Sequence, residues 1–325
     1  MSLQIGIVGT GNFSKLHAGI LEKMEDVRIQ AVCGTSKEKA EKFASQFNHA
    51  HAYEDVQIML DSEKLDAVYI CVPPMTHGKI EMEVIERYIP LFVEKPLGIN
   101  LDLPTEIVRA IEDKSLITSV GYHFRYKKSS QQLKEMLENQ KIGMAIGQWM
   151  GGMPMVPWWR NQQGSGGQFN EQTTHLVDLL RFTAGEVEEV FAMFGNQVMH
   201  EKVDSVTVAD IGTVSLKLRN GSIATLSNTC IMPKDTYRCG LTFYTDQSII
   251  DWQFDGLQVK MNGEQSEIKD QTNPYEVENE AFIHAIRTKD TSRILSNYEN
   301  AYKTQEVTSA AFQSAATGKP IKLNA

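Results

Sequence analysis

The sequence predicts an α/β fold in which a doubly wound parallel sheet is followed by an α+β domain with a mostly antiparallel sheet. Three observations predict it. Apolar strands alternate with amphipathic helices up to about residue 122, this alternation stops after Arg125, and strand patterns then crowd into residues 187–262. Parallel strands need crossovers that cover both sheet faces, whereas strands joined by short turns pair antiparallel. We therefore expect domains at 1–122 and 123–325.

The first domain begins with the strand pattern LQIGIV at residues 3–8, which ends at Gly9. Residues 12–24 then show the apolar spacing of a helix. The same order returns three times, and the strands are expected at 29–33, 66–72 and 90–94, each followed by a helical pattern. A last strand is expected at 116–122. Repeated strand and helix units of this kind predict helices on both faces of a parallel sheet.

The second domain has a different pattern. A helix is expected at 129–140, a loop rich in glycine and tryptophan follows at 151–167, and a second helix is expected at 171–186. Asn-Gly pairs at 219–222 and 261–264 predict tight turns between antiparallel strands. Two final helices are expected at 276–288 and 297–316. This order predicts an antiparallel sheet with helices on one face.

Composition narrows the class of protein. The 325 residues are 42% hydrophobic and 22% charged, which suits a folded chain of about two domains. A net charge of −9 argues against a nucleic-acid partner. Neither a signal peptide nor a run of about 18 apolar residues is present, so a cytoplasmic protein without a membrane partner is expected. The four cysteines lack metal-site spacing, which predicts reduced thiols and no metal.

The turn after the first strand predicts a dinucleotide site. It reads Gly9-Thr10-Gly11-Asn12-Phe13-Ser14, with Ser14 at the third glycine position of the usual motif. The glycines let backbone N–H groups approach a pyrophosphate, and the helix that starts near Asn12 adds its positive end. The alternative is a structural tight turn. The location between a strand and a helix favours the dinucleotide.

The end of the second strand bears on the choice of dinucleotide. An acidic residue there selects NAD, whereas small hydroxyls with a basic residue accommodate the 2′-phosphate of NADP. This chain has Thr35, Ser36 and Lys37 at that position and no acid before Glu38. These residues favour NADP slightly. An ordinary helix N-terminus is the alternative explanation for them.

Two charged residues end the fourth expected strand. Glu94 and Lys95 directly follow Leu91-Phe92-Val93 and precede Pro96. A charge at the end of a buried strand costs free energy unless something pairs with it. Ligands of doubly wound sheets bind beyond the carboxyl ends of the strands, so this pair is a candidate site and a surface turn is the alternative.

A second candidate site lies in the helical pattern after residue 170. Glu171, His175 and Asp178 are spaced i, i+4 and i+7, so on one helix they share a face and bring a base and two acids together. A core histidine is the alternative for His175, and an ion pair with Arg181 is the alternative for Asp178. A metal site is disfavoured because no further Cys or His completes it.

With these features the chain resembles the glucose-fructose oxidoreductase, inositol dehydrogenase and rhizopine-catabolism family, written Gfo/Idh/MocA. The segments that carry the resemblance span nearly the whole chain and are IGIVGTGNFSKLHAGIL, AVYICVPPMTHGKIEMEVI, VEKPLGIN, GYHFRY, NEQTTHLVDLLRFTAGEV and SAATGKPIKL. The resemblance implies an NAD(P)-dependent oxidoreductase with a Rossmann-type first domain. It also implies a large open sheet in the second domain, through which a homodimer or homotetramer forms.

The resemblance implies roles for individual residues. Lys95 projects beside the nicotinamide and exchanges a proton with the substrate hydroxyl, and Glu94 is a polar partner near the cofactor. His175 acts as acid or base, supported by Glu171, which replaces the aspartate of the usual Asp-x-Gly-x-His pattern; Thr173 replaces its glycine. The end of the strand expected at 66–72 packs on the cofactor through Val72, Pro73, Pro74 and His77.

Substrate residues are expected in two places. Tyr122 and Arg125 follow the last parallel strand, and Trp158, Trp159 and Arg160 precede the helix that carries His175. Aromatic faces suit the C–H surface of a sugar or cyclitol, although a double tryptophan suits an interface core equally well. The expected reaction is hydride transfer between NAD(P) and a carbinol carbon of a sugar, cyclitol or polyol. There are two alternatives: a regulatory protein that senses the nucleotide, and an enzyme that oxidises its substrate transiently in order to eliminate or hydrolyse a group.

Overall fold

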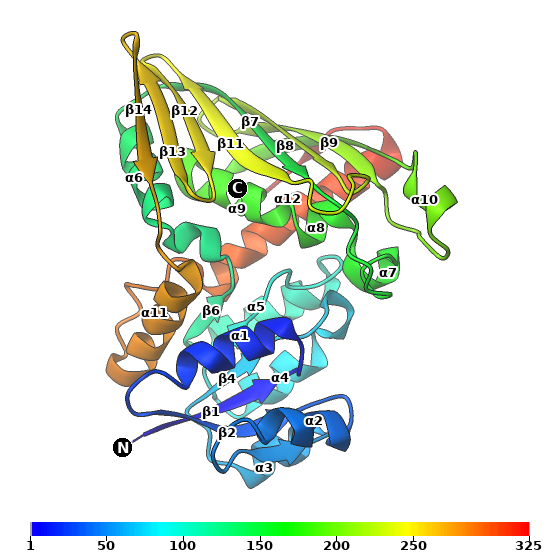
Figure 1. Ribbon diagram of the computed structural model, residues 1–325, viewed down its shortest axis with the longest axis vertical. Helices are drawn as coiled ribbons and strands as arrows, with labels where there is room; N and C mark the ends of the chain where they lie inside the picture. Colours follow the sequence, from blue (N-terminus) through cyan, green and yellow to red (C-terminus); the bar gives the residue numbers. More distant parts are fainter. Residues whose placement is uncertain (1, 325) are drawn as a thin grey trace. The chain divides into compact units, whose positions relative to one another are not determined.

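The computed structural model describes residues 2–324. The chain folds into two compact units, each shown in Figure 1. The first unit contains the chain up to Gly98, Asp102–His123 and Pro274–Tyr302, and the second contains Ile99–Leu101, Phe124–Asn273 and the chain from Lys303 onward. The expected domains 1–122 and 123–325 differ from this division at Ile99–Leu101, at His123 and, over a longer stretch, at Pro274–Tyr302. Pro274–Tyr302 returns to the first unit because apolar residues of its helix join the core of that unit.

A six-stranded parallel sheet forms the centre of the first unit. Its order β3-β2-β1-β4-β5-β6 is that of a Rossmann fold, as expected. The strands are β1 Leu3–Val8, β2 Val27–Cys33, β3 His51–Tyr53, β4 Ala67–Ile70, β5 Leu91–Val93 and β6 Thr118–Val120. The helices are α1 Asn12–Leu21, α2 Lys37–Ala44, α3 Val56–Ser62, α4 Lys79–Glu86, α5 Asp102–Lys114 and α11 Pro274–Thr288. Strand β3 and helix α3 were not expected.

Alternate residues of each strand fill two separate cores on the two faces of this sheet. In β4, Val68 and Ile70 pack in one core with α4 and α5, while Ala67 and Tyr69 pack in the other. Phe282 of α11 joins that second core beside α1. Since both faces are covered, the carboxyl ends of the strands are the edge at which a ligand reaches the sheet.

The second unit contains a nine-stranded sheet in the order β14-β13-β12-β11-β7-β10-β9-β8-β15. All neighbouring strands pair antiparallel except β7 and β10, which are parallel. The strands are β7 Ile142–Met150, β8 Val187–Gly195, β9 Ile211–Leu218, β10 Ile223–Thr229, β11 Arg238–Thr245, β12 Ser248–Gln253, β13 Gly256–Met261, β14 Glu264–Lys269 and β15 Ile321–Lys322. The expected mostly antiparallel sheet is confirmed.

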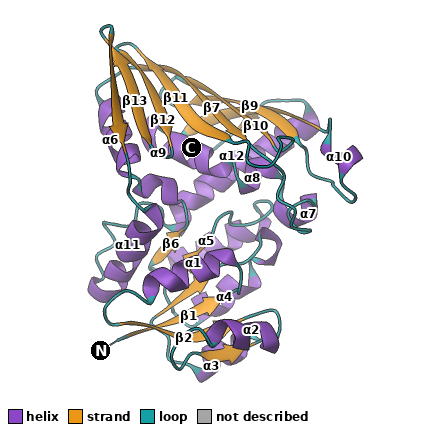
Figure 2. Cartoon of the chain, in the orientation of Figure 1, coloured by secondary structure: helices purple, strands orange, loops and turns teal. Residues whose placement is uncertain are grey.

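Helices cover one face of this sheet (Figure 2). They are α6 Lys128–Glu138, α8 Gln168–Glu171, α9 Thr174–Ala184 and α12 Tyr298–Thr317, whose first residues belong to the first unit. The unit also contains the short helices α7 Gln162–Ser165 and α10 Met199–Lys202. Both Asn-Gly turns join antiparallel strands, and Asn262 and Gly263 have the positive φ of a tight hairpin turn. All four cysteines are free, as expected. No helix within residues 2–324 has the length and apolar composition that a membrane crossing needs.

Candidate functional site

The glycine turn between β1 and α1 has the backbone that a dinucleotide site needs. Gly9 has a φ of +108°, and a Cβ there would lie 2.2 Å from the carbonyl oxygen of Cys71. Gly11 precedes α1, and no other atom lies within 4 Å of where its Cβ would be. Ser14, at the third glycine position, is fully buried. The turn therefore presents the open N-terminus of α1, where N–H groups favour a phosphate.

Two further residues of this turn face solvent. Asn12 is exposed, and the side chain of Phe13 is 41% exposed. The ammonium of Lys95 lies 5.9 Å from the centre of the Phe13 ring. The turn and the expected catalytic lysine are thus neighbours within the first unit.

The hydroxyls after β2 have partners in their own helix. Ser36 Oγ accepts a hydrogen bond from the backbone N–H of Lys39 at 3.3 Å, so Ser36 does cap α2. Thr35 Oγ1 accepts one from the Lys39 ammonium at 3.1 Å, and the N–H of Lys37 donates to Glu54 at 3.2 Å. Lys39 and Glu54 were missed from the sequence. Lys39 could have been found, because it stands four residues after Thr35 at the start of a helix.

A buried histidine and carboxylate follow β4. The segment from Val72 to Pro74 leads to His77, which is 3% exposed. His77 Nδ1 is hydrogen-bonded to Glu81, and Nε2 has no hydrogen-bond partner among residues 2–324. The other Glu81 oxygen accepts from the N–H of Gly78 at 2.6 Å. Glu81 was missed from the sequence, although its i+4 spacing from His77 was visible.

Glu94 and Lys95 continue β5 into the interior. They are 4% and 7% exposed, so the surface turn that was the alternative is wrong. Glu94 Oε1 lies 2.8 Å from Nε2 of His17, on the buried face of α1. The peptide bond between Lys95 and Pro96 is cis. Two charged groups thus occupy the carboxyl end of a central parallel strand, where ligands of such sheets bind.

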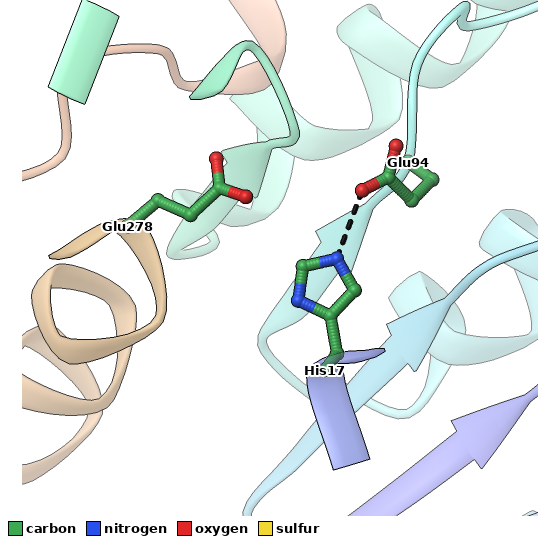
Figure 3. A group of neighbouring side chains, drawn as sticks. All are labelled: His17, Glu94 and Glu278. Carbon is green, nitrogen blue, oxygen red and sulfur yellow. Dashed lines mark hydrogen bonds and ion pairs between the residues drawn. The ribbon is translucent and has the colours of Figure 1, made fainter. Parts of the chain in front are cut away.

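A second acidic group completes a buried cluster of three residues behind this strand end. Figure 3 shows the carboxyl group of Glu278, on α11, directed towards Glu94 and His17. One ligand-capable atom of each residue lies within 4.8 Å of those of the other two, and all three side chains are buried. The set has the residue types of a cation site, which the sequence did not suggest.

The second candidate site differs from its sequence prediction. One helix was expected to carry Glu171, His175 and Asp178 on one face, but α8 ends at Glu171 and α9 begins at Thr174. The N–H of Thr173 bonds back to the carbonyl of Gln168, five residues earlier, which ends the regular helical pattern. The i, i+4, i+7 argument therefore does not apply across this break. Glu171 instead accepts a hydrogen bond from Nε1 of Trp159 at 2.7 Å.

His175 lies among aromatic rings. It is 4% exposed, and its ring centre lies 4.9 Å from that of Phe124 and 5.9 Å from that of Trp149. These contacts place the imidazole on α9 facing β7, with its ring nearly parallel to Trp149. A base held in this way is fixed in orientation, which general acid–base chemistry requires.

Asp178 belongs to a buried ion-pair network. Arg125 donates to both of its oxygens, each at 2.6 Å, and both side chains are buried. Arg181 lies 3.9 Å from the same carboxylate, which is the ion pair given as the alternative for Asp178. Arg125 was expected to bind substrate, but its guanidinium is 2% exposed here. Structural pairing accounts for its position.

The other expected substrate residues are also largely inside their units. Trp159 is 2% exposed and packs in a small core with Met153, Val208 and Cys230. Trp158 packs partly against that core, and Arg160 is half-buried. Tyr122 is fully buried in the first unit. The double tryptophan was alternatively expected in the core of an interface, but Trp159 packs in a core within its own unit.

Two family patterns match this chain. Residues 3–122 match the oxidoreductase family with an NAD-binding Rossmann fold, and residues 130–250 match the GFO/IDH/MocA C-terminal domain. The chain belongs to the Gfo/Idh/MocA family. The expected family and its NAD-binding fold are confirmed.

Relatives within Gfo/Idh/MocA include several sugar and cyclitol dehydrogenases. The chain is 26% identical over 228 residues to myo-inositol 2-dehydrogenase of Thermotoga maritima, an alignment that covers 70% of this chain and 68% of that protein. It is 24% identical to D-glucoside 3-dehydrogenase of Escherichia coli over 99% of this chain and 97% of that one. The structure of levoglucosan dehydrogenase in complex with NADH matches with a TM-score of 0.89 over both whole chains at 17% identity.

Proposed function

We propose that this Gfo/Idh/MocA protein transfers a hydride between NAD(P) and a carbinol carbon of a sugar, cyclitol or related polyol. One observation carries the proposal most directly. Lys95 is 7% exposed at the carboxyl end of β5, within a unit whose glycine turn and strand order are those of a dinucleotide-binding fold. A buried amine at that edge has the chemistry to exchange a proton with a substrate oxygen.

The residues of each unit have separate tasks in this proposal. The nicotinamide supplies the hydride acceptor or donor. As a carbinol is oxidised, its hydroxyl proton passes to a basic nitrogen, and we assign Lys95 and His175 as this acid–base pair. Glu171 supports them, since its carboxylate fixes the Trp159 indole. The turn from Gly9 to Ser14 holds the pyrophosphate through backbone N–H groups.

The test is an absorbance assay of nicotinamide reduction over a panel of inositols, glucosides and anhydrosugars. Lys95→Ala is expected to lower kcat/KM by about 100- to 10,000-fold, the usual range for a general acid or base. Lys23→Ala, which removes an exposed lysine of the same unit, is the matched control and should retain activity. Equal turnover by Lys95→Ala and the wild type would contradict the role of Lys95.

A second reaction has specific support among the relatives. The chain is 24% identical over 201 residues to 2,7-anhydro-N-acetylneuraminate hydratase of Mediterraneibacter gnavus, which it matches over 53% of that protein's length. A transient oxidation would consume substrate without net change in nicotinamide absorbance. Mass spectrometry of the panel therefore accompanies the assay. Binding of NADH with no consumption of any substrate would favour a nucleotide sensor instead.

We propose a slight preference for NADP over NAD. The exposed hydroxyl of Thr35, the half-buried hydroxyl of Ser36 and the ammonium groups of Lys37 and Lys39 lie at the end of β2, where a 2′-phosphate is read. Glu54 opposes this preference by its charge. Fluorescence titration with NADH and NADPH tests it, and Lys39→Ala should weaken NADPH binding more than NADH binding. A tighter fit for NADH in the wild type would refute the preference.

We also propose that a second copy of the chain covers the helix-free face of the nine-stranded sheet. Large apolar residues alternate onto this face and are 36–60% exposed; they are Met144, Ile146, Phe191, Met193, Ile223, Tyr244 and Ile249. Apolar patches of this kind mark protein interfaces. Light scattering should give at least a dimer, and Ile146→Glu with Met193→Glu should give a monomer. A monomeric wild type would refute the proposal.

A further inference from the structure

Three segments that are far apart in the sequence meet in the interior of the first unit. His17 comes from α1, Glu94 from the end of β5 and Glu278 from α11 (Figure 3). Their exposed fractions are 0%, 4% and 0%. Two carboxyl groups this close in a dry interior repel each other if both are ionised, so their protonation states decide what the cluster does.

The proton on His17 follows from its neighbours. The amide nitrogen of Asn279 donates to the carbonyl oxygen of Tyr275 at 2.6 Å and lies 2.8 Å from Nδ1 of His17. An amide NH₂ only donates, so Nδ1 must accept and carries no proton. The imidazole proton is therefore on Nε2 and is donated to Glu94 Oε1. This assignment makes His17 neutral and gives Glu94 the role of an accepting carboxylate.

The same assignment argues against a metal ion in the cluster. A metal would bind the Nε2 lone pair, but Nε2 carries the proton given to Glu94. Binding would have to remove that proton and break the 2.8 Å contact. A proton held within the cluster accounts for the three buried side chains and leaves the contact between His17 and Glu94 intact.

Glu278 lacks the support that Glu94 has. Both of its carboxyl oxygens are buried without a hydrogen-bond partner among residues 2–324. Burial raises the pKa of the Glu278 carboxyl well above its usual value, and the negative charge of Glu94 raises it further. Between two neighbouring carboxyl groups, the one without a donor is the one that keeps a proton.

The other titratable groups around Glu278 are uncharged. Cys71, at the end of β4, has a thiol whose pKa is raised well above its usual value by burial and then by Glu94. Burial, followed by the charge of Glu94, raises the pKa of the Tyr275 phenol. With neutral His17 facing from α1, Glu94 is left as the charged member at the end of β5, next to Lys95.

We propose that Glu278 is a neutral carboxylic acid in the folded protein and a positioning residue for Glu94. Its proton is directed towards the Glu94 carboxylate, across a gap that one water can bridge, so that the cluster carries one negative charge beside Lys95. A second charge would push Glu94 away from His17 and disturb the strand end that carries Lys95. The link to Lys95 chemistry rests on the proposed dehydrogenase function, whereas the protonation state does not.

Unfolding as a function of pH tests the protonation state without any substrate or cofactor. The folded state keeps the Glu278 proton, while the unfolded chain releases it above about pH 4.3. Wild-type stability therefore falls as pH rises towards the folded pKa, and Glu278→Gln, which cannot titrate, lacks this loss. The ratio of their unfolding constants should grow by up to about tenfold per pH unit between about pH 5 and 7.

Glu280→Gln is the matched control, because Glu280 is an exposed glutamate of the same helix. The ratio of the unfolding constants of the wild type and Glu280→Gln should not change with pH. A flat ratio for Glu278→Gln would overturn the proposal. Infrared spectroscopy gives a second measurement if that variant does not fold. The wild type at pH 7 should show the C=O band of a protonated carboxylic acid, and its absence would equally overturn the proposal.

The positioning role is tested by dinucleotide titration and turnover across pH. Glu278→Gln should keep wild-type NADPH affinity and hold it to higher pH, because its amide can replace the acid as a donor. Glu278→Leu should lose affinity at every pH. Gln and Leu have about the volume of Glu, so an equal change of NADPH affinity in the two variants would mean that Glu278 only fills space. If added Zn²⁺ raised the melting temperature of the wild type but not that of Glu278→Gln, the cluster would hold a metal ion in place of the proton, and the proposal would be wrong.

Discussion

In the second unit, the buried carboxylate of Asp178 lies between two guanidinium groups, whereas in the first unit the buried carboxyl of Glu278 faces the carboxylate of Glu94. Asp178 accepts hydrogen bonds from Arg125 and from the hydroxyl of Thr304. Glu278 accepts none from residues 2–324. Opposite charges can neutralise each other permanently, but like charges must be neutralised by a proton, which can leave.

This difference separates a structural cluster from a functional candidate. A buried pair of opposite charges holds segments together and responds little to conditions. Carboxyl groups whose environments push their pKa values apart are typical of sites that bind or move protons. The Asp178 network should therefore govern stability, and the Glu94 cluster should govern pH response.

The largest expected effect is on the Asp178 network. Asp178→Ala should reduce the free energy of unfolding by about 3 to 5 kcal/mol, because it leaves Arg125 and Arg181 buried without their shared carboxylate. Urea unfolding measures this loss.

Glu186→Gln is the control for Asp178→Ala. Glu186 also binds Arg181, at 2.8 Å, but its side chain is 40% exposed. Its replacement should cost under about 1 kcal/mol. Similar losses in the two variants would show that burial of the pair does not matter.

The parallel sheet of the first unit was predictable because its strands are continuous apolar runs ended by glycine or charge. Strand β3 was not, because it has three residues, one of them exposed, and its neighbour α3 has seven. Sequence periodicity needs longer segments than these. The return of Pro274–Tyr302 to the first unit was hidden for another reason, since periodicity identifies helix α11 but not the sheet on which it packs.

The site shows the same limit. Lys95 was predictable because a charge ended an apolar strand, and Gly9 because only glycine fits its turn. Glu278 was not, since it meets His17 and Glu94 from segments more than 180 residues apart in the chain. One signal was present: His17 interrupts the apolar stripe of α1, and a polar residue there needs a buried partner. The helix break before Thr174 left no such signal.

A smaller effect is expected from crowding the Glu94 cluster. A Cβ at Gly121 would lie 2.7 Å from Glu94 Oε1, so Gly121→Ala forces the carboxylate or the backbone to move. The cost should be about 1 to 3 kcal/mol, with weaker dinucleotide binding. Gly19→Ala is the control, because its Cβ meets nothing within 4 Å in α1 and should stabilise the helix by up to about 1 kcal/mol. Equal unfolding midpoints for the two would contradict the crowding.

The smallest effect concerns a carboxylate of the second unit whose pH response should be opposite to that of Glu278. Burial acts to raise the pKa of Asp270, but hydrogen bonds from the N–H of Ser129 and from Thr272 hold it at about 2, below its usual 3.8. Stability from this group is present above pH 3.8 and is lost as pH falls towards 2.

Asp270→Asn should therefore cost about 1 kcal/mol at neutral pH, and the difference from wild type should disappear by about pH 2. Unfolding curves at several pH values measure it, with Asp235→Asn, at an exposed loop position, as a control that shows no such convergence. A difference that instead widened in acid would mean that Asp270 is neutralised by a proton, as we propose for Glu278. The contrast between the two units would then fail.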